Sequence, residues 1–133
     1  MTQKEILEGN KLIADFMEVK NVREYSFNRK IKCLIITEDD GYIDFVEGMN
    51  ILSYHDNWNR LMSVVEKIES IEDCEKSNFQ FSILSDNECE IFGKYIDYQH
   101  PRFSYLNCVK ENSKIKSVYK AAVDFIKWYN ENK

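Results

Sequence analysis

The segment 54–69 constrains the fold most, because a polar helix start is followed there directly by a regular apolar stripe. The apolar residues recur at steps of three and four, the spacing of one helix face: Trp58, Leu61, Met62, Val65 and Ile68. Asp56 or Ser53 is expected to cap the helix by accepting its first unpaired backbone N–H groups. The pattern therefore predicts a helix over 57–69 with one face in a hydrophobic core.

A second helical period lies near the start of the chain. Leu12, Ile13 and Phe16 share one side of a helix expected over 4–18. Gly9 and Asn10 interrupt the pattern, because glycine and asparagine both weaken a helix interior. The helix could therefore start near residue 10 instead of residue 4.

The last 20 residues show the most regular helical period of the chain. Ser113 is a natural cap, and the helix is expected to run from there to about residue 130. Its apolar stripe consists of Ile115, Val118, Ala122, Phe125, Ile126 and Tyr129. Lysines on the other side of this helix are expected to face water.

Strand-like patterns fill the intervals between these helices. Strands are expected at 31–37, 42–46, 79–83, 89–95 and 103–109. Turns at 39–41 and 85–87 are expected to join neighbouring strands into hairpins. The order α-β-β-α-β-β-β-α predicts one compact α+β domain over 1–133, with a mostly antiparallel sheet of about five strands and three helices packed on it.

Three stretches have a distinctive wording: N-K-L-I-A-D-F-M at 10–17, Y-H-D-N-W-N-R-L-M-S-V-V-E-K-I at 54–68, and A-A-V-D-F-I-K-W-Y-N at 121–130. They resemble a family of small uncharacterised phage and prophage proteins, especially of Bacteroidetes-type bacteria. That family has the pattern N-K-L-I-A-E-F-M, Y-H-x-S-W-D-W-L-M-P-V-V-E-K-I and V-V-E-F-I-K-W-Y-N. The chain departs from it at Arg60, where a second Trp is usual, and at Ser63, where Pro is usual. The resemblance implies a phage-type α/β sandwich of unknown activity and identifies no catalytic residue.

Charge and hydropathy narrow the classes of function. The net charge of −5 argues against a general nucleic-acid binder, and no apolar run is long enough to span a bilayer. The N-terminal residues lack the apolar region of a secretory signal, so a cytoplasmic location is expected. Residues 22–34 carry four bases and one acid, whereas 38–47 carry five acids and no base, which indicates faces of opposite sign.

The cysteines are expected to be reduced structural thiols. Cys33, Cys74, Cys89 and Cys108 include no C-x-x-C pair, so neither a metal site nor a disulfide framework is indicated. Cys33 and Cys108 lie among apolar residues in the sequence, where a thiol packs like a small core side chain.

His55 and Asp56 are the most suggestive pair for catalysis, because a carboxylate can orient an imidazole that acts as a general base. Neighbouring residues at a helix start rarely face each other, however, and Asp56 is the expected cap. Tyr54, His55 and Trp58 are more simply interpreted as packing the helix start against the sheet. We expect no catalytic residue, no metal and no cofactor.

Three hypotheses of function remain. In the first, the protein is a non-enzymatic phage-type accessory factor that binds a host protein or ribonucleoprotein, in its most specific version an anti-CRISPR-like inhibitor of a host defence nucleoprotein. Its expected contact residues are Tyr54, His55, Trp58 and Arg60, since aromatic and arginine side chains dominate interfaces. In the second, the protein is an enzyme or small-molecule-binding domain with a pocket near His55 and Trp58.

The third hypothesis is direct binding of single-stranded RNA. Bases and aromatic residues interleave at 23–32 and 94–103, as in surfaces where rings stack on nucleobases and cations contact phosphates. The candidate residues are Arg23, Tyr25, Arg29, Lys30, Lys32, Lys94, Tyr98 and Arg102. The simpler alternative is that these are ordinary strand residues with aromatic side chains inward and bases outward.

Overall fold

The computed structural model describes residues 1–26, 32–36, 51–72, 78–93 and 106–132. It confirms an α+β chain with three helices. The elements are α1 (Gln3–Phe16), β1 (Val22–Ser26), β2 (Lys32–Ile36), β3 (Ile51–Leu52), α2 (Trp58–Glu69), β4 (Phe79–Ile83), β5 (Glu88–Gly93), β6 (Leu106–Lys110) and α3 (Lys114–Asn132).

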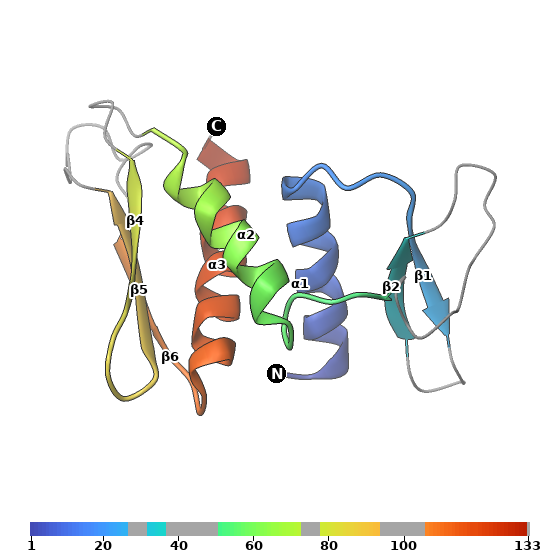
Figure 1. The fold of residues 1–133 in the computed structure, drawn as a ribbon, viewed down its shortest axis with the longest axis horizontal. Helices are drawn as coiled ribbons and strands as arrows, with labels where there is room; N and C mark the ends of the chain where they lie inside the picture. The colour runs from blue at the N-terminus through green and yellow to red at the C-terminus, as the bar shows by residue number, and fades with distance from the viewer. Residues whose placement is uncertain (27–31, 37–50, 73–77, 94–105, 133) are drawn as a thin grey trace.

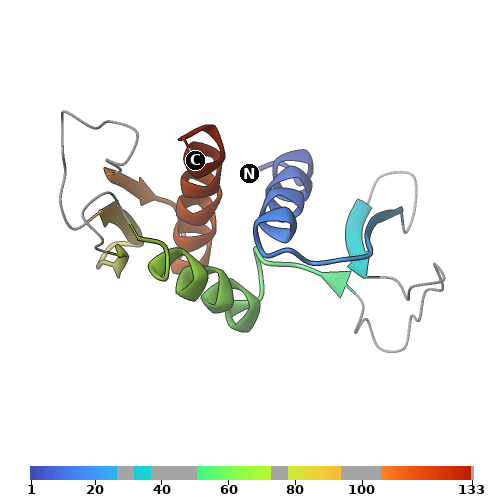
Figure 2. The ribbon, with the colours of Figure 1, turned by 90° about the horizontal axis from the view of Figure 1, so that it is seen from above.

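The strands form two antiparallel sheets of three strands each, in the orders β1-β2-β3 and β4-β5-β6. The predicted antiparallel pairing is confirmed, but the described residues form two sheets with six strands in all, not one sheet of about five. Figures 1 and 2 show the helices lying between the two sheets. Helix α1 contacts β2 on one side, while α3 contacts β5 and β6 on the other. Buried residues of both sheets, Leu34 and Leu52 of the first and Phe79 and Ile91 of the second, belong to one hydrophobic cluster with those of the helices.

The first sheet contains the two strands that the sequence pattern did not predict. Strand β1 pairs with β2 from Val22 opposite Ile36 to Ser26 opposite Lys32. On the other edge of β2, Leu34 lies opposite Leu52 of β3. The predicted partner strand at 42–46 lies outside the described residues. Strand β1 is mostly polar and β3 has only two residues, so neither shows the usual alternation.

The second sheet follows the prediction more closely. Strand β4 has the expected bounds, and the turn between β4 and β5 contains Asp86 and Asn87. Both have positive φ angles, 59° and 58°, as the two central residues of a type I′ hairpin turn require. Strands β5 and β6 are described as Glu88–Gly93 and Leu106–Lys110, whereas the intervening residues 94–105 lie outside the described ranges.

Helix α1 runs through Gly9 and Asn10 without a break, so the alternative start near residue 10 was wrong. The Thr2 hydroxyl caps this helix by accepting the backbone N–H of Glu5 at 3.1 Å. Helix α3 begins directly after Ser113, whose hydroxyl accepts the N–H of Lys116 at 3.3 Å, as predicted.

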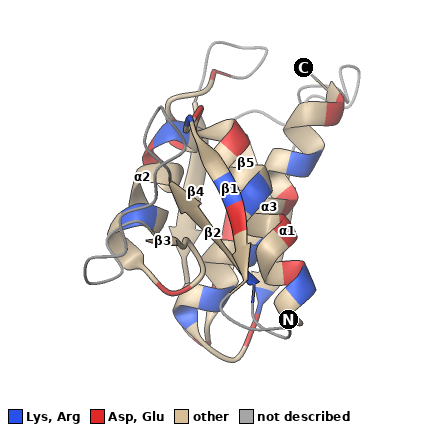
Figure 3. Cartoon of the chain, turned by 90° about the vertical axis from the view of Figure 1, so that its right-hand side faces the viewer, with Lys and Arg blue, Asp and Glu red and all other residues tan. Residues whose placement is uncertain are grey.

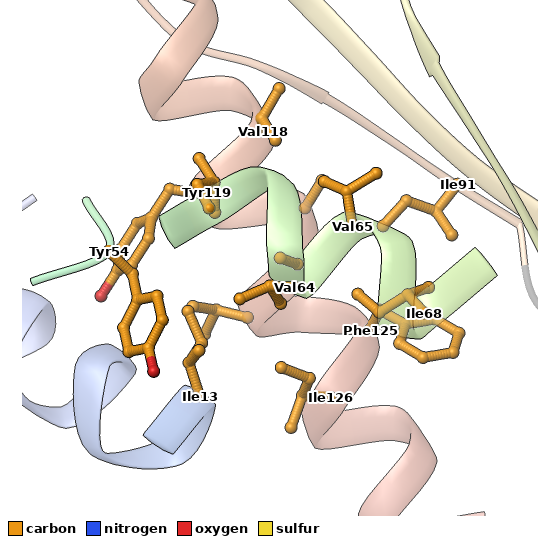
Figure 4. Packing of buried hydrophobic residues seen from close by; sticks show 14 of the residues in the cluster. Ile13, Tyr54, Val64, Val65, Ile68, Ile91, Val118, Tyr119, Phe125 and Ile126 are labelled. Atoms are coloured by element: carbon orange, nitrogen blue, oxygen red, sulfur yellow. The ribbon is translucent and has the colours of Figure 1, made fainter. Parts of the chain in front are cut away.

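The core lies where the three helices pack on the second sheet, and it includes Leu34 and Leu52 of the first sheet. Figure 4 shows core side chains of the helices and the second sheet converging. The stripe of α2 is Leu61, Val64, Val65 and Ile68, all buried. Trp58, which was expected on this stripe, is 41% exposed and lies outside the core. The helical period was predicted correctly, but the buried face of α2 includes Val64 and excludes Trp58.

The cysteines are only partly as expected. Cys89 is fully buried, and its burial raises the pKa of the thiol to about 12. Cys33 is part-buried, and burial likewise raises its pKa. Cys108 is exposed, because its partner across the strands is Glu90 on the outer face of the sheet, so its predicted apolar surroundings were wrong. Cys74 lies outside the described residues.

Candidate functional site

The candidate site lies where the chain leaves β3 and enters α2, close to α1 (Figure 2). Asn57 caps α2, since its side-chain oxygen accepts the backbone N–H of Arg60 at 3.1 Å. The predicted cap, Asp56 or Ser53, was therefore wrong. The Ser53 hydroxyl instead donates a hydrogen bond to a carboxylate oxygen of Asp56. Both side chains are thus free of the capping role and available to a polar cluster.

Asn10 joins this cluster from the interior of α1. It is only 4% exposed. Its side-chain oxygen accepts the backbone N–H of Tyr54 at 3.3 Å, and its Nδ2 lies 3.3 Å from Nδ1 of His55. A buried polar side chain needs such partners, because leaving it unpaired would be unfavourable. Asn10 therefore ties the first helix to the segment that precedes the second.

His55 lies at the centre of the polar cluster. Its Nδ1 is 3.0 Å from the Ser53 hydroxyl oxygen, and its Nε2 is 3.6 Å from Oδ2 of Asp56. The bond from the Tyr54 N–H fixes the orientation of the Asn10 amide, so that Nδ2 faces the imidazole. Since an amide nitrogen only donates, Nδ1 accepts, and the neutral ring carries its hydrogen on Nε2.

Two buried tyrosines, Tyr54 and Tyr119, lie next to the polar cluster on its core side. The ring of Tyr119 meets the His55 ring edge to face, with centroids 6.1 Å apart. The Tyr119 hydroxyl donates to the carbonyl oxygen of Ile6 at 2.9 Å, and burial raises its pKa. Burial also raises the pKa of Tyr54, and the nearby Arg60 charge opposes this shift. The imidazole is thus supported by a helix–helix contact of the core.

A cavity of about 270 Å³ opens beside the cluster, and we call it the junction cavity. Its lining is Gln3, Ile6, Leu7, Asn10, Lys32, Cys33, Leu34, Ile51, Leu52, Ser53, His55 and Asp56. The helix α1 contributes residues at steps of three and four, which share one face, and β2 and β3 contribute the apolar wall. Polar groups therefore meet an aliphatic surface in one concave place.

A second hollow of about 470 Å³ lies along α1 and shares Gln3, Leu7 and Lys32 with the junction cavity. Lys11 and Glu24, which also line it, form an ion pair. Figure 3 shows acidic and basic residues interspersed on α1 and β1 on this side of the molecule. The described part of this side is therefore not a face of one sign, and the acidic run 38–47 lies outside the described residues.

The four predicted contact residues are placed differently from one another. Trp58 is exposed at the first turn of α2, and Arg60 is part-exposed on the same turn. His55 is part-exposed beside the junction cavity. Tyr54 is buried in the core, so in this conformation it supports the segment instead of offering its ring to a partner.

The structure describes three of the eight RNA candidates. Arg23 and Tyr25 share one face of β1, and Lys32, opposite Ser26, lies on the other face of the sheet. Arg29, Lys30, Lys94, Tyr98 and Arg102 lie outside the described residues. The second candidate stretch follows β5, which belongs to the other sheet. Because all of 94–103 lies outside the described residues, the RNA-binding hypothesis stays a prediction.

The polar cluster contains the residue types of a serine hydrolase triad. Its connections differ from a triad, because Asp56 accepts the Ser53 hydroxyl directly and Asn10 occupies Nδ1 of His55. The single hydroxyl hydrogen of Ser53 can serve one acceptor at a time. What the cluster offers a ligand is a donor, the Nε2–H of His55, next to a carboxylate acceptor.

Sequence reasoning missed Asn10 and Ser53 as members of this site. A signal was present for Asn10, which occupies a polar position on the stripe Ile6, Asn10, Ile13 and Met17, with helical steps of four, three and four. A polar residue on an apolar stripe indicates a buried hydrogen bond to another element.

In the part of the chain that the structure describes, no group of three or more His, Cys, Asp or Glu could hold a metal ion. None of the described helices is both long and apolar enough to cross a membrane. No protein-family model, no curated protein and no solved structure matches the chain.

Proposed function

We propose that the protein is a non-enzymatic accessory factor that acts by binding another macromolecule through the first turn of α2. The observation that carries this proposal is the exposure of Trp58, a large aromatic side chain outside the core. Exposed tryptophan and arginine are the residue types that most often dominate binding energy. Trp58 and Arg60 occupy one helical turn, which Asn57 fixes by capping it.

The proposed target is a host defence nucleoprotein, with anti-CRISPR-like inhibition as the specific form of the activity. The resemblance to phage proteins supports this target, as does the net charge of −5. An acidic protein can compete with nucleic acid for a basic channel, because complementary potentials speed and orient association. Such a factor would act in the cytoplasm of a bacterial host.

The test is protection of a phage in a bacterium with active CRISPR immunity. Expression of the protein should raise the plating efficiency of the targeted phage, and the purified effector nucleoprotein should bind it directly. Trp58→Ala should weaken that binding by about 30-fold, the effect of removing an interface residue worth about 2 kcal/mol. Arg60→Ala should weaken it as well.

Leu106→Ala is the matched control, because Leu106 is 57% exposed on β6 of the other sheet. It removes an exposed apolar side chain without touching α2, and should leave protection unchanged. Equal loss of binding in Trp58→Ala and Leu106→Ala would contradict the proposed surface. Unchanged plating efficiency with every effector class tested would contradict the proposed target.

The non-enzymatic part of the proposal has its own test. A fluorophosphonate probe labels serine nucleophiles that an adjacent base activates. Because Ser53 donates to Asp56 and Asn10 occupies the imidazole Nδ1, no labelling of Ser53 is expected. Stoichiometric labelling that disappears in Ser53→Ala would establish a nucleophile and refute this part of the proposal.

A further inference from the structure

We propose that the junction cavity binds a small neutral molecule that carries a carboxamide group on a short aliphatic body. The inference is separate from the proposed partner surface, since neither Trp58 nor Arg60 lines this cavity. It depends on three properties of the cavity, namely its size and aliphatic wall, its paired donor and acceptor, and its balanced charge.

The size and the wall indicate a small aliphatic body. A volume of about 270 Å³ corresponds to about nine water molecules at ~30 Å³ each, so the ligand has a similar number of non-hydrogen atoms or fewer. Ile6 and Leu7 of α1 face this space together with Leu34 and Leu52 of the sheet. An apolar wall with a few polar groups is the usual composition of a ligand site.

The polar group of the ligand follows from His55 and Asp56. Nδ1 of His55 accepts from Asn10, and the Ser53 hydrogen is donated to Asp56, so Nε2–H is the ring donor that remains for a ligand. Its distance of 3.6 Å from Oδ2 of Asp56 is longer than a hydrogen bond. A donor and an acceptor therefore lie side by side without satisfying each other. A carboxamide complements both, because its carbonyl oxygen accepts from Nε2–H and its N–H donates to Oδ2.

The charges of the lining favour a neutral ligand. The lining contains one lysine, Lys32, and one acidic residue, Asp56, so these two charges balance. A carboxylate ligand would meet the Asp56 carboxylate, and an ammonium ligand would present only donors to Nε2–H. Each charged analogue thus leaves one member of the pair unsatisfied, which is unfavourable in a partly buried site.

Three molecules with one aliphatic body test this chemistry: isovaleramide, isovalerate and isoamylamine. Each is titrated into the full-length protein while two-dimensional NMR follows the backbone amides and the Asn10 side-chain amide. We expect isovaleramide to bind in the millimolar range and to shift the signals of residues that line the junction cavity. The carboxylate and the amine should bind roughly tenfold more weakly, since each loses one hydrogen bond.

A substitution separates recognition of the carboxamide from simple filling of the cavity. Asp56→Asn removes the negative charge and supplies a donor. In this variant isovalerate should therefore bind more tightly than isovaleramide. Asp56 is exposed, and the substitution preserves its shape, so the fold should be retained. The control is Asp124→Asn on α3, which removes the same charge beside Lys120 and should leave the preference unchanged.

Several results would overturn the proposal. They are equal affinity for all three molecules, absence of shifts at tens of millimolar isovaleramide, or shifts confined to residues away from the junction cavity. A change of preference in Asp124→Asn equal to that in Asp56→Asn would show an effect of net charge alone. None of these results depends on whether Trp58 contacts a macromolecular partner.

Discussion

A single methyl group added at Gly9 should lower the stability of the fold measurably. It lies in α1 against α3, and a Cβ atom built on it would overlap the hydroxyl oxygen of Tyr119. The same Cβ would lie 3.0 Å from Cζ of Tyr119 and 3.2 Å from Cγ2 of Val123. Tyr119 is 1% exposed and its hydroxyl is held by Ile6, so its ring cannot move into solvent. Gly9→Ala must therefore displace packed atoms.

The magnitude follows from three opposing contributions. Overpacking of a core costs about 1–3 kcal/mol, and the displaced Tyr119 hydrogen bond costs about 1 kcal/mol more. Alanine in place of glycine within a helix gains about 1 kcal/mol. We therefore expect Gly9→Ala to lower the free energy of unfolding by about 1–3 kcal/mol, although helix propensity alone predicts stabilisation.

The assay is urea denaturation of a double-mutant cycle with Tyr119→Phe. Tyr119→Phe alone should cost about 1 kcal/mol, because it leaves the Ile6 carbonyl oxygen without its donor. In that background the methyl group added by Gly9→Ala no longer meets a hydroxyl, so the coupling energy should be about 1 kcal/mol or more. Glu8→Ala, an exposed neighbour, serves as control and should change stability by less than about 0.5 kcal/mol. Stabilisation by Gly9→Ala, or strict additivity of the two substitutions, would refute the reasoning.

Three further outcomes are expected. Asn57→Ala should lower the free energy of unfolding by about 1 kcal/mol through loss of the α2 cap, and Asp56→Ala should lower it by less. Urea denaturation measures both, and a larger loss in Asp56→Ala would indicate that Asp56 is the cap. Burial raises the pKa of Cys89 to about 12 from 9.0, so the folded state keeps its proton where the unfolded state loses it. Its contribution to stability should therefore be complete below pH 9 and decline by up to about 1.4 kcal/mol per pH unit above it, a decline that Cys89→Ala should reduce. Trp58→Ala should change the midpoint of thermal unfolding little, whereas Trp128→Ala, which removes a ring packed against the core, should lower it clearly. An equal decrease in both variants would indicate that Trp58 packs in the core.

The helices were predictable because their information is local. Helix α3 carries its cap and its stripe within one continuous segment, and both were found where the pattern placed them. Helix α2 was predicted to within one residue, although its buried face includes Val64 and excludes Trp58. The helical period determines that an apolar stripe exists, but the neighbouring elements select which of two adjacent rows is buried.

The number of sheets was not predictable from the same patterns. Strand β1 exposes Arg23 and Glu24, and Glu24 faces α1, where Lys11 pairs with it. Because the side chain that β1 directs toward α1 is an exposed, ion-paired acid, the strand shows no regular alternation of apolar and polar residues. Strand β3 is too short to show any period. The strands of the first sheet are thus determined by pairing with β2, which is a tertiary interaction.

The candidate site depends even more on tertiary structure. Asn10 and His55 are 45 residues apart, and their contact exists only after α1 has packed beside the β3–α2 segment. The sequence identified His55, Asp56 and Trp58 as notable residues but assigned the cap to the wrong side chain. Once Asn57 takes the cap, Asp56 becomes available to Ser53 and His55. Because Asp56 was assigned to the cap, its hydrogen bond with Ser53 beside His55 was not predicted.

The two proposals for this protein depend on one structural support. Asn10 holds the backbone N–H of Tyr54 and the ring of His55, and the same segment leads directly into the turn that carries Trp58. Loss of the Asn10 side chain would leave a buried N–H unpaired and release His55, so both the junction cavity and the α2 surface should be impaired together. Changes at Trp58 or at Asp56, by contrast, alter only one of the two. Partner binding and carboxamide binding are thus separable at their contact residues, whereas Asn10→Ala should weaken both, and any effect of one ligand on the affinity of the other must be reciprocal.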